Sequence, residues 1–298
     1  MPQDQKSTSF VKTMIYTILA LMAFAANSVI CRLALKDGAI DPGMFTSIRL
    51  SSGAIVLIVL VLISKERRQE KSKGSWVSAG MLFLYAAAFS YAYVSLETGI
   101  GALIIFGVVQ ITMIASSFIS GYRMNGLEWL GILLALAGFL YLLLPGASAP
   151  SLSGFILMTL SGIGWGIYSL RGKNAKHPLV DTAYNFLRAL PFLILLFYFL
   201  AQESNYSTRG VLLALLSGIV TSGIGYTIWY AALKGLNSIQ ASIVQLLVPV
   251  LAAIGGVIFV GELISFRLMA ASLMILGGIL LLIIKRIPPK QKHKQHLS

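Results

Sequence analysis

Two arginines, Arg49 and Arg188, lie inside long apolar stretches of this sequence. A guanidinium binds a carboxylate through parallel hydrogen bonds, so the chemistry open to these residues is the binding of an anionic group or the gating of access to one. The structural alternative is that each side chain, about one helical turn from the start of its stretch, reaches the polar end of its helix. The sequence leaves both interpretations open.

The two arginines are 139 positions apart, and the same shift relates many other parts of the chain. One ungapped shift over so much of a sequence predicts a duplicated unit, with a first copy in residues 12–145 and a second in residues 152–284. The equivalent positions include Arg32 and Arg171, Ser78 and Ser217, Gly138 and Gly277, and the segments 91–104 and 230–243.

The composition is that of a membrane protein. Apolar residues make up 57% of the chain and charged residues 11%, with a mean hydropathy of +0.84, whereas a soluble domain carries about a quarter charged residues. Ten stretches reach the length of about 20 residues that a spanning helix needs. Backbone groups in lipid must bond within their own segment, so the sequence predicts an all-α integral membrane protein with ten transmembrane helices. The stretches are 12–31, 44–63, 76–96, 99–120, 127–145, 152–170, 182–200, 210–232, 238–260 and 267–284.

The basic residues predict how the chain is oriented. With a cytoplasmic N-terminus, seventeen lysines and arginines of the loops and tails lie on the cytoplasmic side and four on the other, which are Arg32, Lys36, Arg209 and Arg267. Both termini are then cytoplasmic at the inner membrane, and residues 285–298 form a basic cytoplasmic tail. Residues 14–31 resemble a signal peptide, but they align with 153–170 under the shift, which favours a retained first span.

Five spans in each copy is an odd number, so the second five-helix repeat is predicted to be inverted relative to the first. Inverted repeats are typical of secondary transporters, in which the substrate binds near the midplane between the halves and access alternates. The expected partners are a small-molecule substrate and the lipid bilayer, and the expected state is a monomer. Apart from Arg49 and Arg188, the basic residues lie in short loops and tails between apolar runs, which does not predict nucleic-acid binding.

The titratable residues argue against several other classes. Cys31 is the only cysteine, and the histidines His177, His293 and His296 fall in a loop or the tail, so we expect no metal site. All carboxylates fall in tails, loops or span ends, which predicts a neutral or zwitterionic substrate and leaves no mid-span proton relay. Without a phosphate-binding glycine loop or buried Asp or His residues, we expect no enzyme, no ATP-driven pump and no cofactor.

Aromatic residues within the spans are candidates for the substrate site. Trp165 and Tyr168 lie beside small residues that let helices approach closely, and Tyr85, Phe89 and Tyr226 belong to stripes with helical spacing. Such stripes also suit a packed core, so a pocket and a core both remain open. The other tryptophans are predicted to belong to the interfacial belt, namely Trp76, Trp129 and Trp229.

Amides in the fourth and ninth spans are further candidates. Pro249 has no N–H, so the Gln245 carbonyl loses its helical partner and, with the Gln245 amide, could bind an amino or carboxylate group. Gln110 lies inside the fourth span. Both amides could equally join neighbouring helices through hydrogen bonds.

These residues together resemble the EamA family of the drug/metabolite transporter superfamily. The resemblance rests on Tyr230-Ala231-Ala232-Leu233, then Pro249 near the middle of a span, then Gly261-Glu262 at its end, within a duplicated five-span unit. It implies the export of small metabolites, amino acids among them, and is closest in general likeness to the aromatic amino acid exporters. In the first copy, Gln110 stands at the position of Pro249 and Arg123 at that of Glu262. A structural or gating role of Pro249 and Glu262 is therefore confined to the second copy.

The resemblance adds Asn27 to the candidate substrate-binding residues. Small multidrug relatives carry a membrane-embedded Glu where this chain has Asn27 and Ser28. We therefore expect a secondary transporter that exports amino acids, with facilitated export as the simplest energetics and proton coupling through Glu262 left open. The alternative is a transporter or exchanger of phosphorylated or nucleotide-linked sugars, which would call for more cations within the spans than Arg49 and Arg188.

Overall fold

A computed structural model describes residues 10–64, 73–121, 123–146, 149–172, 175–200, 206–236 and 238–284. In these ranges the only pairing of extended backbone is an isolated bridge between Ile40 and Tyr206. The all-helical architecture predicted from the sequence is therefore confirmed. The predicted basic tail, residues 285–298, lies outside the described residues.

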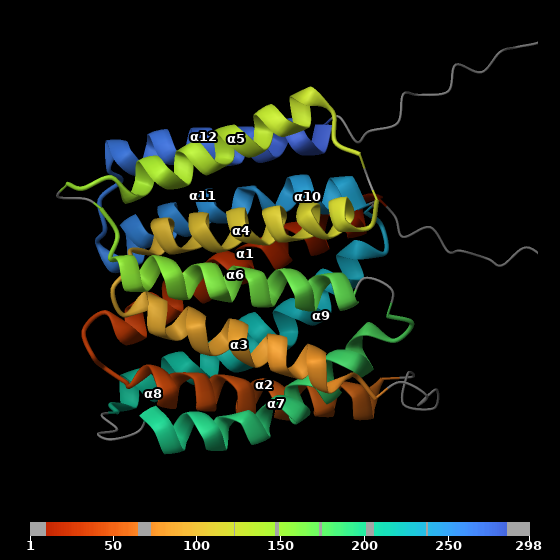
Figure 1. The fold of residues 1–298 in the computed structure, drawn as a ribbon. Coiled ribbons are helices and arrows are strands. Elements are labelled where there is room, and N and C mark those ends of the chain that lie inside the picture. Colours follow the sequence, from red (N-terminus) through yellow and green to blue (C-terminus); the bar gives the residue numbers. More distant parts are fainter. Residues whose placement is uncertain are drawn as a thin grey trace, which may run out of the picture.

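The helices run back and forth along one direction and form an elongated bundle (Figure 1). We call the end where Phe10 and Ile284 lie the terminal end, and the other the far end. The helices are α1 (Phe10–Leu35), α2 (Pro42–Ile63), α3 (Trp76–Tyr93), α4 (Thr98–Ile119), α5 (Gly126–Leu143), α6 (Leu152–Gly172), α7 (Pro178–Leu200), α8 (Thr208–Leu216), η2 (Ser217–Ile224), α9 (Gly225–Leu233), α10 (Ser238–Gln245), α11 (Leu247–Gly255), η3 (Gly256–Val260) and α12 (Phe266–Ile284).

Local capping residues decide where several helices begin. Asp41 precedes Pro42, and its Oδ1 accepts hydrogen bonds from the backbone N–H groups of Gly43 (2.7 Å) and Met44 (3.1 Å). Asn125 and Glu128 form a reciprocal capping box at the start of α5. These side chains satisfy N–H groups that have no partner in the first helical turn.

Two rods depart from regular α-helix. In the first, α8 and α9 are joined by the wider π-helical turns of η2, so that residues 208–233 form one continuous rod. In the second, the α-helix is interrupted at Leu246, between α10 and α11, next to Pro249. The interruption agrees with the loss of the backbone hydrogen bond that proline cannot donate to Gln245.

Eight rods in the described ranges are long and apolar enough to cross a membrane. They are α1, α2, α4, α5, α6, the rod 208–233, the rod 240–260 and α12. Their outer faces expose large apolar side chains, such as Leu133, Ile156 and Leu273. Lipid is the surrounding in which such a surface is stable, so the chain is a multi-pass membrane protein.

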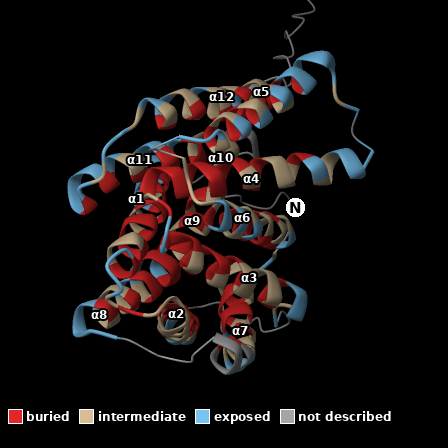
Figure 2. Ribbon diagram, turned by 60° about the vertical axis from the view of Figure 1, so that its left-hand side comes forward, coloured by how far each residue is buried: buried red, intermediate tan, exposed pale blue. Residues whose placement is uncertain are grey.

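The helices pack in an order that brings distant segments together. On one side of the bundle α5 lies along α12, and on the other α2 lies along α7 (Figure 1). Between them α6 packs against α3, and α1 packs against α8, η2 and α9. Buried residues are concentrated where these central helices meet, and exposed ones follow the outside (Figure 2).

The contact between α5 and α12 depends on two facing glycines. A Cβ added to Gly131 would lie 2.6 Å from the carbonyl oxygen of Gly278, and one added to Gly278 would collide with the backbone of Gly131. Both obstacles are backbone atoms, which cannot rotate away. The neighbouring Gly277 has open space where its Cβ would be.

We expect Gly278→Ala to destabilise the protein by about 1–3 kcal/mol, because the helices must separate to admit the methyl group. Gly277→Ala is the matched control and should be neutral or slightly stabilising, because the helix gains propensity without a collision. Thermal unfolding of the two variants in the same detergent checks this. Equal melting temperatures would contradict the assigned contact.

Candidate functional site

Three cavities follow one another from the terminal end to the middle of the bundle. We call the outermost cavity the vestibule, and its volume is about 440 Å³. The next cavity, the passage, has a volume of about 40 Å³, and the innermost cavity, the chamber, has a volume of about 20 Å³. The vestibule and the passage share Gly172 and Tyr230, and the passage and the chamber share Trp165 and Tyr226. The cavities are therefore adjacent, with aromatic side chains between them, and we call this row of cavities the path.

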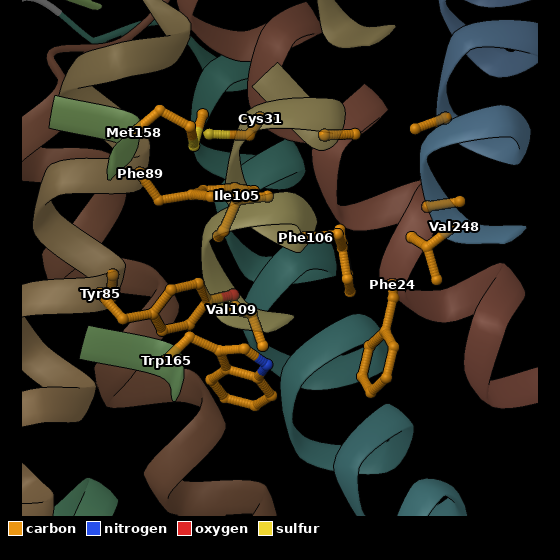
Figure 3. Packing of buried hydrophobic residues seen from close by; sticks show 14 of the residues in the cluster. Phe24, Cys31, Tyr85, Phe89, Ile105, Phe106, Val109, Met158, Trp165 and Val248 are labelled. Atoms are coloured by element: carbon orange, nitrogen blue, oxygen red, sulfur yellow. The ribbon is translucent and has the colours of Figure 1, made fainter. Parts of the chain in front are cut away.

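Aromatic side chains from both halves of the chain enclose the chamber. The Trp165 ring lies 4.8 Å from Tyr85, 5.0 Å from Tyr226 and 6.4 Å from Phe24, measured between ring centres. Figure 3 shows Trp165 beside Tyr85, with Phe24 on the α1 side. Five residues predicted for substrate binding line this chamber: Asn27, Tyr85, Phe89, Trp165 and Tyr226. The chamber thus lies at the seam between the halves.

Asn27 supplies a polar contact across this seam. Its Oδ1 accepts hydrogen bonds from the hydroxyls of Ser217 (2.7 Å) and Thr221 (2.9 Å), which both lie on η2. Asn27 and Thr221 also line the chamber. The wide turns of η2 bring both hydroxyls to one acceptor, and the amide fixes α1 against the second half.

Arg49 lies at the centre of the bundle, with 1% of its surface exposed. Its Nε donates a hydrogen bond to the Ser222 hydroxyl (3.1 Å), and its Nη2 donates one to the Tyr85 hydroxyl (2.6 Å). The guanidinium carbon lies 5.1 Å from the centre of the Tyr85 ring and 5.2 Å from that of the Phe89 ring. Its Nη1 is buried and has no hydrogen-bond partner among the described residues. The structural alternative, in which Arg49 reaches the end of its helix, is therefore wrong for this residue.

The equivalent arginine of the second copy has other surroundings. Arg188 is partly exposed, donates through Nη1 to the Lys73 carbonyl, and lies 5.6 Å from the ring centre of Trp76. Trp76 is itself 57% exposed, as expected of a belt residue. The structural alternative that fails for Arg49 therefore describes Arg188.

The vestibule carries charged and hydroxylic side chains. Arg171 donates through Nε to the Ser78 hydroxyl at 3.1 Å, and both residues line the cavity together with Asp181. Tyr168, predicted for the substrate site, lines the vestibule instead of the chamber, with its ring stacked 5.5 Å from that of Trp165. Tyr168 thus belongs to the path but not to its innermost part.

A cluster around Glu262 closes the far end. Glu262 Oε1 forms an ion pair with Arg32 Nε at 3.2 Å, and Oε2 accepts the backbone N–H of Thr98 at 2.8 Å. Arg32 also donates to the Tyr93 carbonyl at 3.0 Å. Burial and the negative charge of Glu262 raise the pKa of Glu97, and the positive charge of Arg32 offsets part of this increase. These contacts join both halves of the chain on the side opposite the vestibule.

The amides of the fourth and ninth spans do not line the chamber. Gln110 is buried on α4, and its Nε2 reaches the Ser242 carbonyl at 3.5 Å. Gln245 is also buried, at the interruption before Pro249. Neither amide lines the three cavities. The Gln110 contact matches the alternative in which an amide joins neighbouring helices.

One aromatic prediction was wrong, and some lining residues were missed. Trp229 is buried, lines the passage and lies 5.7 Å from the Phe24 ring, because α9 turns it toward α1 and not toward lipid. Phe24 escaped notice, although it precedes Asn27 by three residues and so shares its helix face. Thr221 was also missed, since its direction depends on the π-helical turns.

Comparisons with known proteins place this architecture. A solved crystal structure aligns with a TM-score of 0.62 and 20% identity, covering 92% of this chain and 96% of that chain, which shows a shared fold. An uncharacterized protein of Pseudomonas aeruginosa is 50% identical over 93% of this chain and 96% of its own length. The threonine/homoserine exporter RhtA of Escherichia coli is 26% identical, over 80% of this chain and 79% of its own.

The EamA-like transporter family matches the sequence twice, over residues 11–144 and again over residues 152–284. Together the two matches cover nearly the whole chain. Both matched segments contribute side chains to the chamber, Tyr85 from the first and Trp165 from the second. The chain belongs to the EamA-like transporter family.

Proposed function

We propose that this protein is a secondary transporter that exports amino acids, neutral and aromatic ones among them, across the inner membrane by alternating access. The observation that carries the proposal is the path of three cavities, which leads from the terminal end to an aromatic chamber at the seam, while an ion pair joins the two halves at the far end. A solute site between two halves, reachable from one side at a time, is the arrangement that alternating access requires.

The packing supports two inverted five-helix repeats. The shift of 139 residues makes α1 equivalent to α6, and α3 equivalent to η2 and α9. In the bundle α6 packs against α3, and α1 packs against η2 and α9. The first helix of each repeat therefore packs against the third helix of the other repeat. When α3 and α7 are added to the eight rods described above, each repeat has five spans.

The loop charges support loading from the cytoplasm. With the excess of lysine and arginine on the inside, both termini and the terminal end face the cytoplasm. The vestibule of about 440 Å³ then opens toward the cytoplasm, and its size is within the range of small-molecule sites. The ion pair between Arg32 and Glu262 would be the closed external gate.

The relatives and the chamber favour amino acids over sugar phosphates. One relative is named a threonine/homoserine exporter, and another, from Salmonella typhimurium, carries the words "amino-acid metabolite efflux pump" in its name. The chamber is lined mainly by aromatic and aliphatic side chains. A phosphorylated sugar would call for several buried cations along the path, and the described lining of the three cavities includes only Arg171.

Transport in proteoliposomes tests the proposal. A panel of amino acids should include neutral or aromatic members that are carried with saturation, at rates little changed by a pH gradient, because the spans offer no mid-membrane carboxylate as a proton carrier. Sugar phosphates should not be carried. Transport of sugar phosphates alone would overturn the proposal in favour of the alternative.

The aromatic wall gives a second prediction. Trp165→Ala should reduce amino-acid transport by about tenfold or more, because the ring lines both the passage and the chamber and the loss of a packed aromatic contact at a binding site costs about 2 kcal/mol. Trp76→Ala, at an exposed ring, is the control and should retain most of the activity. Rates are compared at equal amounts of folded protein. Equal losses would contradict a role of Trp165 in the path.

The proposed orientation gives a third prediction. In a Cys31→Ala background, Lys176→Cys near the vestibule and Tyr206→Cys at the far end are both exposed positions. A membrane-impermeant maleimide should label the cysteine at position 206 in intact cells and the one at position 176 only after the membrane is broken. The reverse pattern would place the termini outside.

A further inference from the structure

We propose that Arg49 binds the carboxylate group of the transported solute. This inference rests on the proposed function and extends it, since it states which chemical group of the solute is recognised and by which residue. The group is one that every free α-amino acid carries. Its recognition would separate amino acids from the corresponding amines, which an aromatic chamber alone does not do.

The first argument is the uncompensated charge of Arg49. A guanidinium buried in the middle of a membrane protein is costly unless an anion or a full set of hydrogen-bond acceptors surrounds it. No carboxylate of the described residues forms an ion pair with Arg49, and its polar contacts are the neutral hydroxyls of Ser222 and Tyr85. The rings of Tyr85 and Phe89 offset part of the cost through cation–π contact.

The second argument is an unused hydrogen-bond donor. Arg49 Nη1 is fully buried and has no hydrogen-bond partner within the described part of the chain, whereas buried polar atoms in folded proteins are almost always hydrogen-bonded. The other terminal nitrogen, Nη2, already contacts the Tyr85 hydroxyl. The two terminal nitrogens of a guanidinium match the two oxygens of a carboxylate, so one carboxylate can satisfy both.

The third argument is where the donors converge. The Tyr85 oxygen accepts from Arg49 at 2.6 Å and from the Tyr226 hydroxyl at 3.3 Å, and both tyrosines line the chamber. A carboxylate oxygen in the place of the Tyr85 oxygen would accept the same donors and would add a full negative charge. Charge-assisted hydrogen bonds are about twice as strong as neutral ones, so this exchange is favourable.

The size of the chamber links binding to movement. Its volume of about 20 Å³ holds about one water molecule, so a solute enters only when the tyrosines and Trp165 separate. Arg49 also bonds Ser222 on η2 and thereby joins the two halves. A carboxylate that draws Arg49 away from Ser222 and Tyr85 would favour the conformation in which the halves have moved, because a ligand shifts an equilibrium through its differential affinity.

The test compares an amino acid with its decarboxylated analogue. Purified protein in proteoliposomes is loaded with labelled phenylalanine or phenethylamine, which share the aromatic side chain and the ammonium group. The wild-type protein should prefer phenylalanine by about tenfold or more, since a site built for a polar group discriminates strongly against its absence. Arg49→Gln should lose most phenylalanine transport and this preference with it, and Arg49→Lys, which keeps the charge, should recover part of both.

The duplication provides a matched control. Arg188→Gln removes the arginine at the equivalent position of the second copy, which contacts a carbonyl and an exposed ring, whereas Arg49 contacts Tyr85 and Phe89 of the chamber lining. It should retain the preference for phenylalanine. Thermal unfolding with added phenylalanine gives a second readout that needs no transport: the ligand should raise the melting temperature of the wild type and of Arg188→Gln, but not that of Arg49→Gln.

The outcomes separate the two proposals. The carboxylate assignment is overturned if Arg49→Gln keeps the wild-type preference for phenylalanine over phenethylamine. It is also overturned if chloride, but not phenylalanine, raises the melting temperature of the wild type and this effect is lost in Arg49→Gln. In both cases the proposed amino-acid export stands. If no amino acid on the panel is transported or stabilises the wild type, the proposed function itself fails. Correct folding of each variant is checked by its unfolding transition without ligand.

Discussion

Hydrocarbon offers no hydrogen-bond partners, and this constraint governs every polar group inside the bundle. Asn27 meets it through two hydroxyls on η2, and Arg49 meets it in part through Ser222 and Tyr85. Each of these contacts crosses from one helix to another, and most cross from one half of the chain to the other. The polar residues of the spans therefore hold the seam together, and the seam is where the chamber lies.

Equivalent arginines in the two copies of the repeat have different surroundings. Arg49 is enclosed by hydroxyls and rings, whereas Arg188 lies at a carbonyl and an exposed tryptophan. Arg32 closes the far end with Glu262, while its equivalent Arg171 lines the open vestibule. Equivalent arginines of the duplicated unit thus make different contacts, both at the two ends of the bundle and within the spans.

The difference between the ends bears on the direction of transport. Ion pairing and backbone hydrogen bonds seal the far end, and hydroxyls and charged groups surround the vestibule at the terminal end. Aromatic rings, which have little polar surface to satisfy, separate the vestibule from the chamber. The contacts between these rings are largely apolar, whereas the far end is held by an ion pair. Under the proposed function, the structure is therefore closer to the state that loads solute from the cytoplasm.

The sequence by itself determined the helical class, the membrane setting, the family resemblance and most helix bounds, because hydropathy, capping residues and the repeat are local or periodic signals. It also named five of the residues that line the chamber. The tertiary structure decided what the sequence left open, namely that Arg49 is enclosed while Arg188 is not and that Gln110 and Gln245 do not line the chamber. It also corrected the predicted position of Trp229, which faces inward. The direction in which a side chain points depends on which distant helix packs beside it and on the π-helical turns of η2, and neither can be read from the residues nearby.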